Sequence, residues 1–169
     1  LTLDAPGVSN YGNFYSNINQ LNLLIDKVSG TDLITAANKN YYLGIAYGMR
    51  AYYYFHLTRS WGDVIIQTEP TTVIDIANLA KAASPAADVM KLVKEDIDRS
   101  LQAFGADYSF RNTKSWWSKA ATQMLRAEVY LWTSHKGGGN ADAQVAKSAL
   151  TDIQSGISSL SLLPSYSNV

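Results

Sequence analysis

Hydrophobic residues recur every three or four positions along most of the chain, which is the spacing of amphipathic α-helices. The pattern predicts five helices, at residues 9–29, 35–60, 84–104 and 115–135, and from a cap at Asn140 onward. Gly30, Gly62 and Gly105 each follow a periodic stretch and should end a helix. Residues 62–83 should form a long irregular connection, with an extended start and one helical turn at 74–79.

Each predicted helix has an apolar face that should meet a neighbour. In the first helix, Asn and Ser residues lie between the apolar positions and are expected on its solvated side. The third helix should begin with Ser84 as N-cap and Pro85 as its first residue. The apolar face of the fourth helix is expected to comprise Trp117, Ala120, Ala121, Met124, Leu125, Leu131 and Trp132. That of the fifth is expected to comprise Ala146, Ala149, Leu150, Ile153 and Ile157.

Small residues on these faces indicate closely packed helix pairs. Gly44 and Gly48 lie four apart inside the second predicted helix, where glycine costs about 1 kcal/mol relative to alanine. Close approach of a neighbouring helix would compensate that cost. The third and fourth helices start some thirty residues apart, near the tetratricopeptide period of about 34, and the fifth starts sooner. The predicted fold is therefore all-α, with antiparallel helix pairs in a degenerate tetratricopeptide-like superhelix and irregular loops.

The composition argues against several classes of function and site. Hydrophobic residues make up 47% and charged residues 17%, and 14 basic side chains balance 14 acidic ones. A net charge of zero argues against binding nucleic acid. The absence of cysteine excludes disulfides and thiolate metal sites within this sequence. Residues 1–169 are interpreted as one helical domain, a fragment of a longer protein.

Catalytic, metal and cofactor sites are not expected. His56 and His135 have no second metal ligand at helical spacing. Glu95, Asp96 and Asp98 point in different directions on one helix, so a solvated face is expected rather than an acid–base pair. Residues 136–139 lack the order of a phosphate-binding loop and should form a turn.

Aromatic side chains are the candidates for ligand binding. Eleven tyrosines suit partly solvated surfaces, because tyrosine has an apolar body and a polar tip. Trp61 is assigned to packing at a turn, and Trp116 and Trp117 should point about 100° apart on a helix, so that at most one faces the core. The ligand-binding candidates are Trp116, Trp117, Tyr108 and Tyr11.

Two charged residues, Arg50 and Glu128, fall in apolar helix stretches. The favoured interpretation is ion pairing across neighbouring helices, and the alternative is a ligand anchor.

Three stretches of the sequence match the ordered motifs of one known family. Residues 50–64, RAYYYFHLTRSWGDV, are similar to a helix of that family that ends in an aromatic-Gly-Asp-Val turn. Glu69-Pro70 and the helix at 84–104 are similar to the exit from that turn and the helix that follows it. Residues 120–132, AATQMLRAEVYLW, are similar to a later helix. Together the three stretches resemble the SusD/RagB family of Bacteroidetes nutrient-binding lipoproteins.

The resemblance implies a non-catalytic protein on the cell surface of the outer membrane. It would work with a SusC-like TonB-dependent transporter and bind a glycan or peptide. Its membrane anchor would be a lipidated cysteine that this sequence does not contain. Two alternatives remain open: a generic helical-repeat module for protein–protein interaction, and a surface glycan hydrolase.

Overall fold

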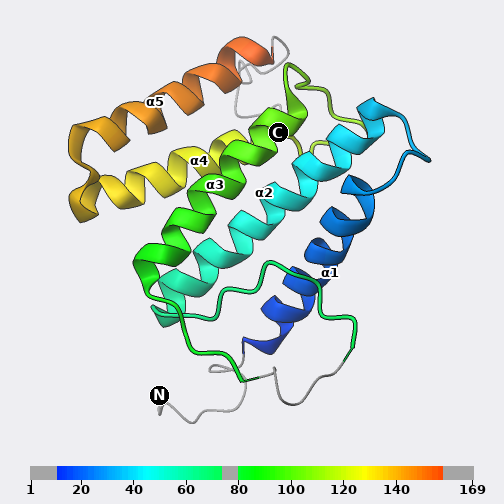
Figure 1. The fold of residues 1–169 in the computed structure, drawn as a ribbon. Helices are drawn as coiled ribbons and strands as arrows, with labels where there is room; N and C mark the ends of the chain where they lie inside the picture. The colour runs from blue at the N-terminus through cyan, green and yellow to red at the C-terminus, as the bar shows by residue number, and fades with distance from the viewer. Residues whose placement is uncertain (1–10, 74–79, 158–169) are drawn as a thin grey trace, which may run out of the picture. The chain divides into compact units, whose positions relative to one another are not determined.

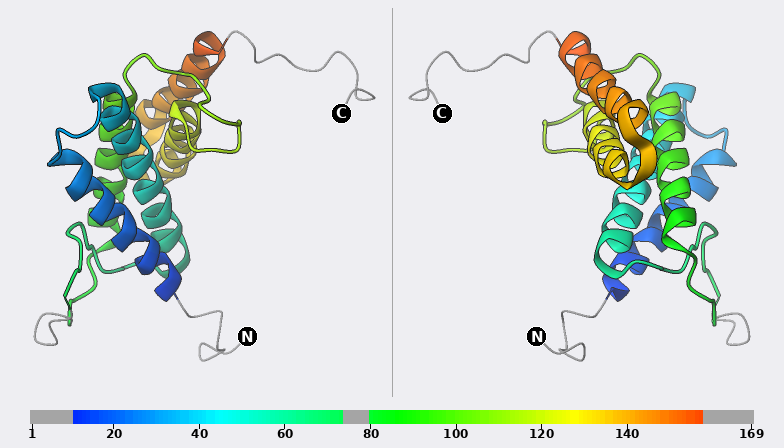
Figure 2. Two further views of the ribbon diagram at one scale, coloured as in Figure 1. Left: turned by 90° about the vertical axis from the view of Figure 1, so that its right-hand side faces the viewer. Right: turned by 90° about the vertical axis from the view of Figure 1, so that its left-hand side faces the viewer.

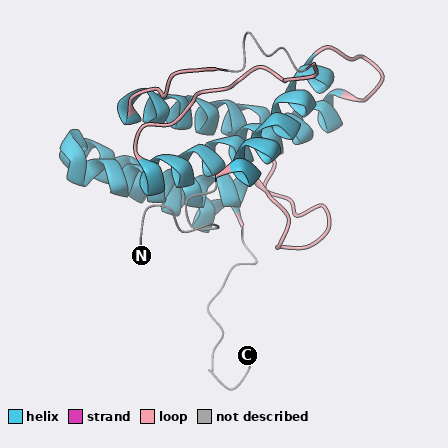
Figure 3. Cartoon of the chain, turned by 90° about the horizontal axis from the view of Figure 1, so that it is seen from below, coloured by secondary structure: helices cyan, strands magenta, loops and turns pink. Residues whose placement is uncertain are grey.

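The computed structural model describes residues 11–73 and 80–157, and the described part is helical with no β-strand (Figure 1, Figure 3). Its α-helices are α1 (Gly12–Ser29), α2 (Ala36–Trp61), α3 (Ala86–Phe104), α4 (Lys119–Thr133) and α5 (Gly139–Gly156). An isolated antiparallel bridge joins Val64 to Ser84. The predicted all-α class of antiparallel helix pairs is confirmed. None of the described helices is both long and apolar enough to span a lipid bilayer.

The chain divides into two compact units, residues 1–105 and 106–169. In the first unit α1, α2 and α3 run alternately up and down, and α2 contacts both of the others (Figure 1, Figure 2). The fully buried core of this unit includes Ile18, Tyr54, Phe55, Leu57, Val93 and Ile97. Burying a side chain of this size contributes about 1.5–3 kcal/mol. Helix α2 therefore buries residues on two sides, because it has a neighbouring helix on each.

Close helix approach occurs at Gly44 of α2. A Cβ atom there would lie 2.8 Å from the ring of Phe104 on α3. The hydroxyl of Ser100 donates a hydrogen bond of 2.6 Å to the Gly44 carbonyl oxygen. The close approach of a neighbouring helix, predicted to compensate for a glycine inside α2, is therefore present at Gly44.

The ends of α2 follow local sequence signals. The Thr35 side chain caps the start by accepting a hydrogen bond from the Asn38 amide. Gly62 ends the helix with φ of 77°, a conformation that favours glycine. Its amide donates to the Thr58 carbonyl oxygen at 3.0 Å.

In the second unit α4 and α5 form an antiparallel pair around small residues. Ala127, Ala146 and Ala149 are buried together, with Tyr130 packed against them. The connection Ser134–Gly138 is a π-type turn in which Lys136 and Gly137 leave helical geometry. The expected turn at residues 136–139 is thus confirmed, and the alanines allow the two helices to approach.

Three helix starts differ from the predictions. Ser84 pairs with Val64, so Pro85 occupies the N-cap position of α3. Helix α4 begins after Ser118, whose side chain accepts from the Ala121 amide, rather than at Ser115. Helix α5 begins at Gly139, before Asn140. The predicted start at Ser9 and the turn at 74–79 lie outside the described residues.

The predicted apolar face of α4 is also partly wrong. Met124, Leu131 and Trp132 are 54%, 48% and 38% exposed, and Leu150 of α5 is 40% exposed. Polar Thr122 and Gln123 are buried instead. The Trp117 indole donates to the Thr122 hydroxyl, and the Gln123 side-chain nitrogen donates to the Asp152 carboxylate, whereas Gln123 Oε1 has no partner among the described residues.

Candidate functional site

Residues 62–73, here called the post-α2 segment, run from the end of α2 across to α1 (Figure 1). The backbone of Val64 pairs with Ser84, and side chains of the two helices form hydrogen bonds with the backbone at Ile65, Gln67, Glu69 and Thr71. The Tyr15 hydroxyl on α1 donates to the Ile65 carbonyl oxygen at 2.7 Å. The Tyr54 hydroxyl on α2 donates to the Gln67 carbonyl oxygen at 2.9 Å and accepts from the Gln67 amide at 2.7 Å.

Two asparagines of α1 hold the second half of the segment. Asn19 accepts from the Thr71 amide at 2.7 Å and donates to the Thr71 carbonyl oxygen at 3.2 Å. Asn22 donates to the carbonyl oxygens of Gln67 at 2.9 Å and Glu69 at 3.3 Å. The Asn19 side chain thus bonds both the amide and the carbonyl group of Thr71, as the backbone of a neighbouring strand would.

Arg50 joins all of these elements. Its guanidinium forms two hydrogen bonds with the Asp96 carboxylate on α3, at 2.7 and 2.8 Å. A third, at 2.8 Å, reaches the Asn22 side-chain oxygen. Arg50, Asp96 and Asn22 are 2%, 0% and 1% exposed.

These contacts decide three sequence-based interpretations. The structural ion pair of Arg50 across neighbouring helices is confirmed. Asp96 is not on a solvated face, and Asn22 is not on the solvated side of α1, because the pairing makes their burial favourable. Glu128 lies on an exposed part of α4.

Burial and pairing shift the pKa values of this cluster. Burial lowers the pKa of Arg50, but the hydrogen bonds and charge of Asp96 outweigh it and raise the pKa overall. Burial raises the pKa of Tyr15 and of Tyr54 from 10.0 to about 12 in each case. Both phenols therefore stay protonated, as their donation to backbone oxygens requires.

A groove lies between α1 and the post-α2 segment, with a volume of about 670 Å³. An adjoining hollow of about 230 Å³ extends it towards Trp61 and Asp63. Both are lined by Tyr11, Tyr15, Ile65 and Lys81. We call the two together the α1 groove. Tyr15 and Asn19, which form hydrogen bonds with the backbone of the segment, also line the groove.

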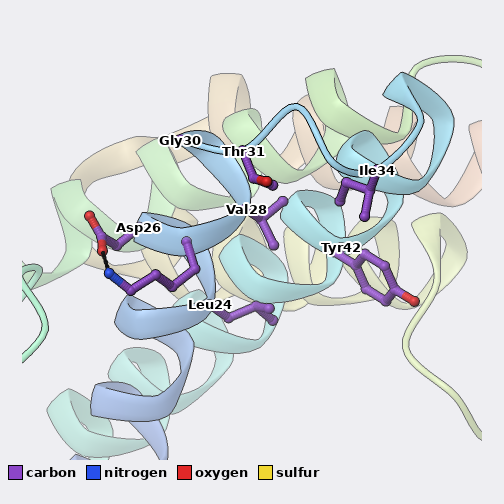
Figure 4. Close-up of a pocket in the computed structure, with 8 residues that line it drawn as sticks. Leu24, Asp26, Val28, Gly30, Thr31, Ile34 and Tyr42 are labelled. Atoms are coloured by element: carbon purple, nitrogen blue, oxygen red, sulfur yellow. Dashed lines mark ion pairs between the residues drawn. The ribbon is translucent and has the colours of Figure 1, made fainter.

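A second hollow lies near the connection between α1 and α2 (Figure 4). It has a volume of about 690 Å³, and Leu24, Val28, Ile34 and Tyr42 give it a mainly apolar lining. Asp26 and Lys27 form an ion pair of 3.1 Å at its side. The hydrogen-bonding side chains of its lining are Asp26, Lys27, Thr31 and Tyr42.

The structure distributes the four predicted ligand-binding residues over both units. Tyr11 lines the α1 groove, and its ring contacts Tyr15 and Trp61 edge to face with centroids 5.7 Å apart in each case. The assignment of Trp61 to packing is confirmed by this contact and by its contact with Phe14.

The other three candidates belong to the second unit. Trp116 and Trp117 precede α4, so the predicted helical geometry for this pair is wrong. Trp116 is 56% exposed, whereas Trp117 is half-buried and donates to the Thr122 hydroxyl at 2.9 Å. The ring of Tyr108 is half-buried beneath the Lys119 ammonium, 4.0 Å away.

Sequence reasoning missed Tyr15, Asn19 and Lys81 as groove residues. A signal existed for two of them, because Tyr11, Tyr15 and Asn19 are spaced four apart and lie along one side of α1. Among the described residues, no group of three acidic or histidine side chains could hold a metal ion. His56 packs against Tyr52 with ring centroids 4.5 Å apart, and His135 is exposed.

Comparison with known proteins decides the family. Residues 2–131 match the SusD-like family described as "Starch-binding associating with outer membrane". The chain belongs to the SusD-like family. It is 53% identical to Bacteroides fragilis NanU, with a TM-score of 0.84 over 91% of this chain and 30% of that one.

Two further relatives support the assignment to the SusD-like family. A SusD superfamily protein from Bacteroides vulgatus is 50% identical, with a TM-score of 0.80 over 88% of this chain and 30% of that one. SusD-like protein P38 of Formosa agariphila is 29% identical over 143 residues, which is 83% of this chain and 25% of that protein. This SusD-like chain therefore spans between a quarter and a third of the length of these relatives.

The stretch that carries the family resemblance has a structural role in this SusD-like chain. Residues 50–64 supply Arg50 and Tyr54, which hold the post-α2 segment, and Gly62, which ends α2. The motif thus encodes the helix, its end and the attachment of the segment that follows.

Proposed function

We propose that this chain is the helical part of a cell-surface lipoprotein of the outer membrane that binds a glycan or peptide nutrient for a SusC-like TonB-dependent transporter. The observation that carries the proposal is the family match over residues 2–131, whose description names starch binding and the outer membrane. The lipid would be attached to a cysteine outside this sequence, which contains none.

The proposed mechanism is non-covalent. The network around Arg50 fixes three helices and the post-α2 segment relative to one another, which provides a pre-ordered support for binding surfaces. The buried Asp96 carboxylate is engaged by Arg50 and is therefore a poor acid or base for glycan hydrolysis.

The test uses the full-length protein rather than this chain alone. Calorimetric titrations with soluble starch, laminarin and a casein digest should reveal saturable binding of at least one of them. Prolonged incubation should yield no new reducing ends or free amines, and turnover would contradict the proposed role.

The transporter is tested by co-purification from outer membranes. A tagged full-length protein should retain a large β-barrel protein after gentle detergent extraction. If it retains no such partner and binds no nutrient, the helical-repeat adaptor becomes the better interpretation.

A further inference from the structure

We propose that the α1 groove is a binding site for a neutral oligosaccharide. This inference rests on the proposed function and assigns one ligand class to one surface. The main hollow and its extension share four lining residues, so together they form one continuous site. The volume of the main hollow, about 670 Å³, falls in the usual range for small-ligand sites.

The aromatic component of the site is Tyr11. Its side chain is 41% exposed, and edge-to-face contacts with Tyr15 and Trp61 restrict its ring orientation. An aromatic ring held in place presents apolar area at a low entropic cost, and the phenol adds a hydrogen-bonding tip. That combination matches a sugar, which has apolar C–H faces and hydroxyl edges.

The polar lining is fixed in position and keeps spare hydrogen-bonding capacity. Asn19 uses one amide hydrogen and one oxygen lone pair on Thr71, and each of its atoms can form one more hydrogen bond. The Lys81 ammonium uses one donor on the Gln67 side chain and has two others. Asp63 accepts from the Ala86 amide through Oδ1 at 2.8 Å, which leaves Oδ2 to accept from a ligand hydroxyl.

The charge of the lining favours an uncharged ligand. Of the residues that line the two hollows, Asp63 and Lys81 are charged, and their charges cancel. A polyanionic or strongly basic ligand would find no net complementary charge there. The hollow of Figure 4 has an Asp26–Lys27 ion pair at its side and is otherwise mainly apolar.

The experiment is calorimetric titration of the full-length protein with maltoheptaose, laminarihexaose and cellohexaose. Hexagalacturonic acid and a neutral hexapeptide serve as contrasting probes. Tyr11→Ala should weaken binding of the preferred oligosaccharide about tenfold, as expected for loss of one aromatic contact. Tyr11→Phe should stay within about twofold of wild type, which also separates loss of the ring from loss of folding.

Tyr42→Ala is the matched control, because Tyr42 is 42% exposed and lines the other hollow. It should leave the affinity unchanged. If the wild type binds an oligosaccharide and Tyr11→Ala binds it equally well, the groove assignment is wrong while the proposed function stands. A preference for the hexapeptide or the acidic glycan would overturn the ligand class. Binding of no oligosaccharide would overturn the inference, and the transporter test would then judge the proposed function separately.

Discussion

Arg50 is positively charged, yet only 2% of its surface is exposed. Removing such a charge from water costs several kcal/mol, and only well-oriented partners offset it. Here the Asp96 carboxylate provides both charge and two hydrogen bonds, and the Asn22 oxygen accepts a third. Arg50 therefore links three helices. Removal of any of its partners should lower the free energy of unfolding.

Asp96→Ala should destabilise the protein by about 3–5 kcal/mol, because the Arg50 charge would be left buried without its counter-ion. Urea denaturation monitored by circular dichroism measures the change. Glu95→Ala is the control, since Glu95 is the exposed neighbour and its replacement should change stability by no more than about 0.5 kcal/mol.

The double replacement Arg50→Met with Asp96→Leu distinguishes the cost of an unpaired charge from that of lost contacts. It should be more stable than Asp96→Ala, because no charge is left buried. A double variant as unstable as the single one would show that the hydrogen bond of Arg50 to Asn22 is the larger contribution.

Stability should fall in alkaline solution as Tyr15 and Tyr54 ionise. Burial raises the pKa of both phenols from 10.0 to about 12, so folding favours their protonated forms. Their contribution is complete below pH 10.0 and is lost as the pH rises through about 12. The phenolate absorbance of the folded protein should show a late step near pH 12. That step should disappear in a variant with Tyr15→Phe and Tyr54→Phe, and its persistence would contradict the assignment.

Among the elements, α2 depends most on a close neighbour. Gly44→Leu should cost about 1–3 kcal/mol, because the new side chain must displace the Phe104 ring, which lies 2.8 Å from the Cβ position. Thermal and urea denaturation measure this loss. Gly30→Ala is the control, since a Cβ there would meet only the Asp26 carbonyl oxygen, at 3.5 Å. Equal stability of the two variants would mean that α2 and α3 are packed differently.

The post-α2 segment should open locally when its side-chain partners are removed. The amides of Gln67 and Thr71 donate to Tyr54 and Asn19, so both should be protected from hydrogen exchange in the wild type. Tyr54→Phe should abolish protection at Gln67, and Asn19→Ala should abolish it at Thr71, with smaller effects on the helices. Tyr42→Phe should alter neither amide, because Tyr42 lies outside this network.

For the whole molecule, the division at Gly105 predicts that residues 1–105 fold alone. The Arg50 network and the core of the three helices lie within this part of the chain. A protein truncated after Gly105 should be helical by circular dichroism and unfold cooperatively. A non-cooperative melt would show that the first unit requires the second for its stability.

Membership of the SusD-like family is also a property of the whole molecule. The match extends over residues 2–131 and therefore includes parts of both units. The matched part of this chain covers 25% to 30% of the length of these relatives, so the activity of a whole relative is only proposed for this chain.

The sequence by itself determined the helices, the C-terminal ends of the first three and the family. Helix periodicity depends on spacing alone, and Thr35, Gly30, Gly62 and Gly105 act on backbone groups within a few residues. Arg50 could also be assigned to an ion pair, because a charge in an apolar stretch requires a partner.

Only the tertiary structure decided which polar residues are buried and where the groove lies. Periodicity places Asn22 and Asp96 on helix faces, but their burial depends on partners that are distant in sequence. The post-α2 segment has no periodic pattern, and its conformation is set by α1 side chains 45 to 52 residues away. The exposure of Met124 and Leu131 also depends on residues distant in sequence, because a hydrophobic residue is buried only where a neighbour covers it.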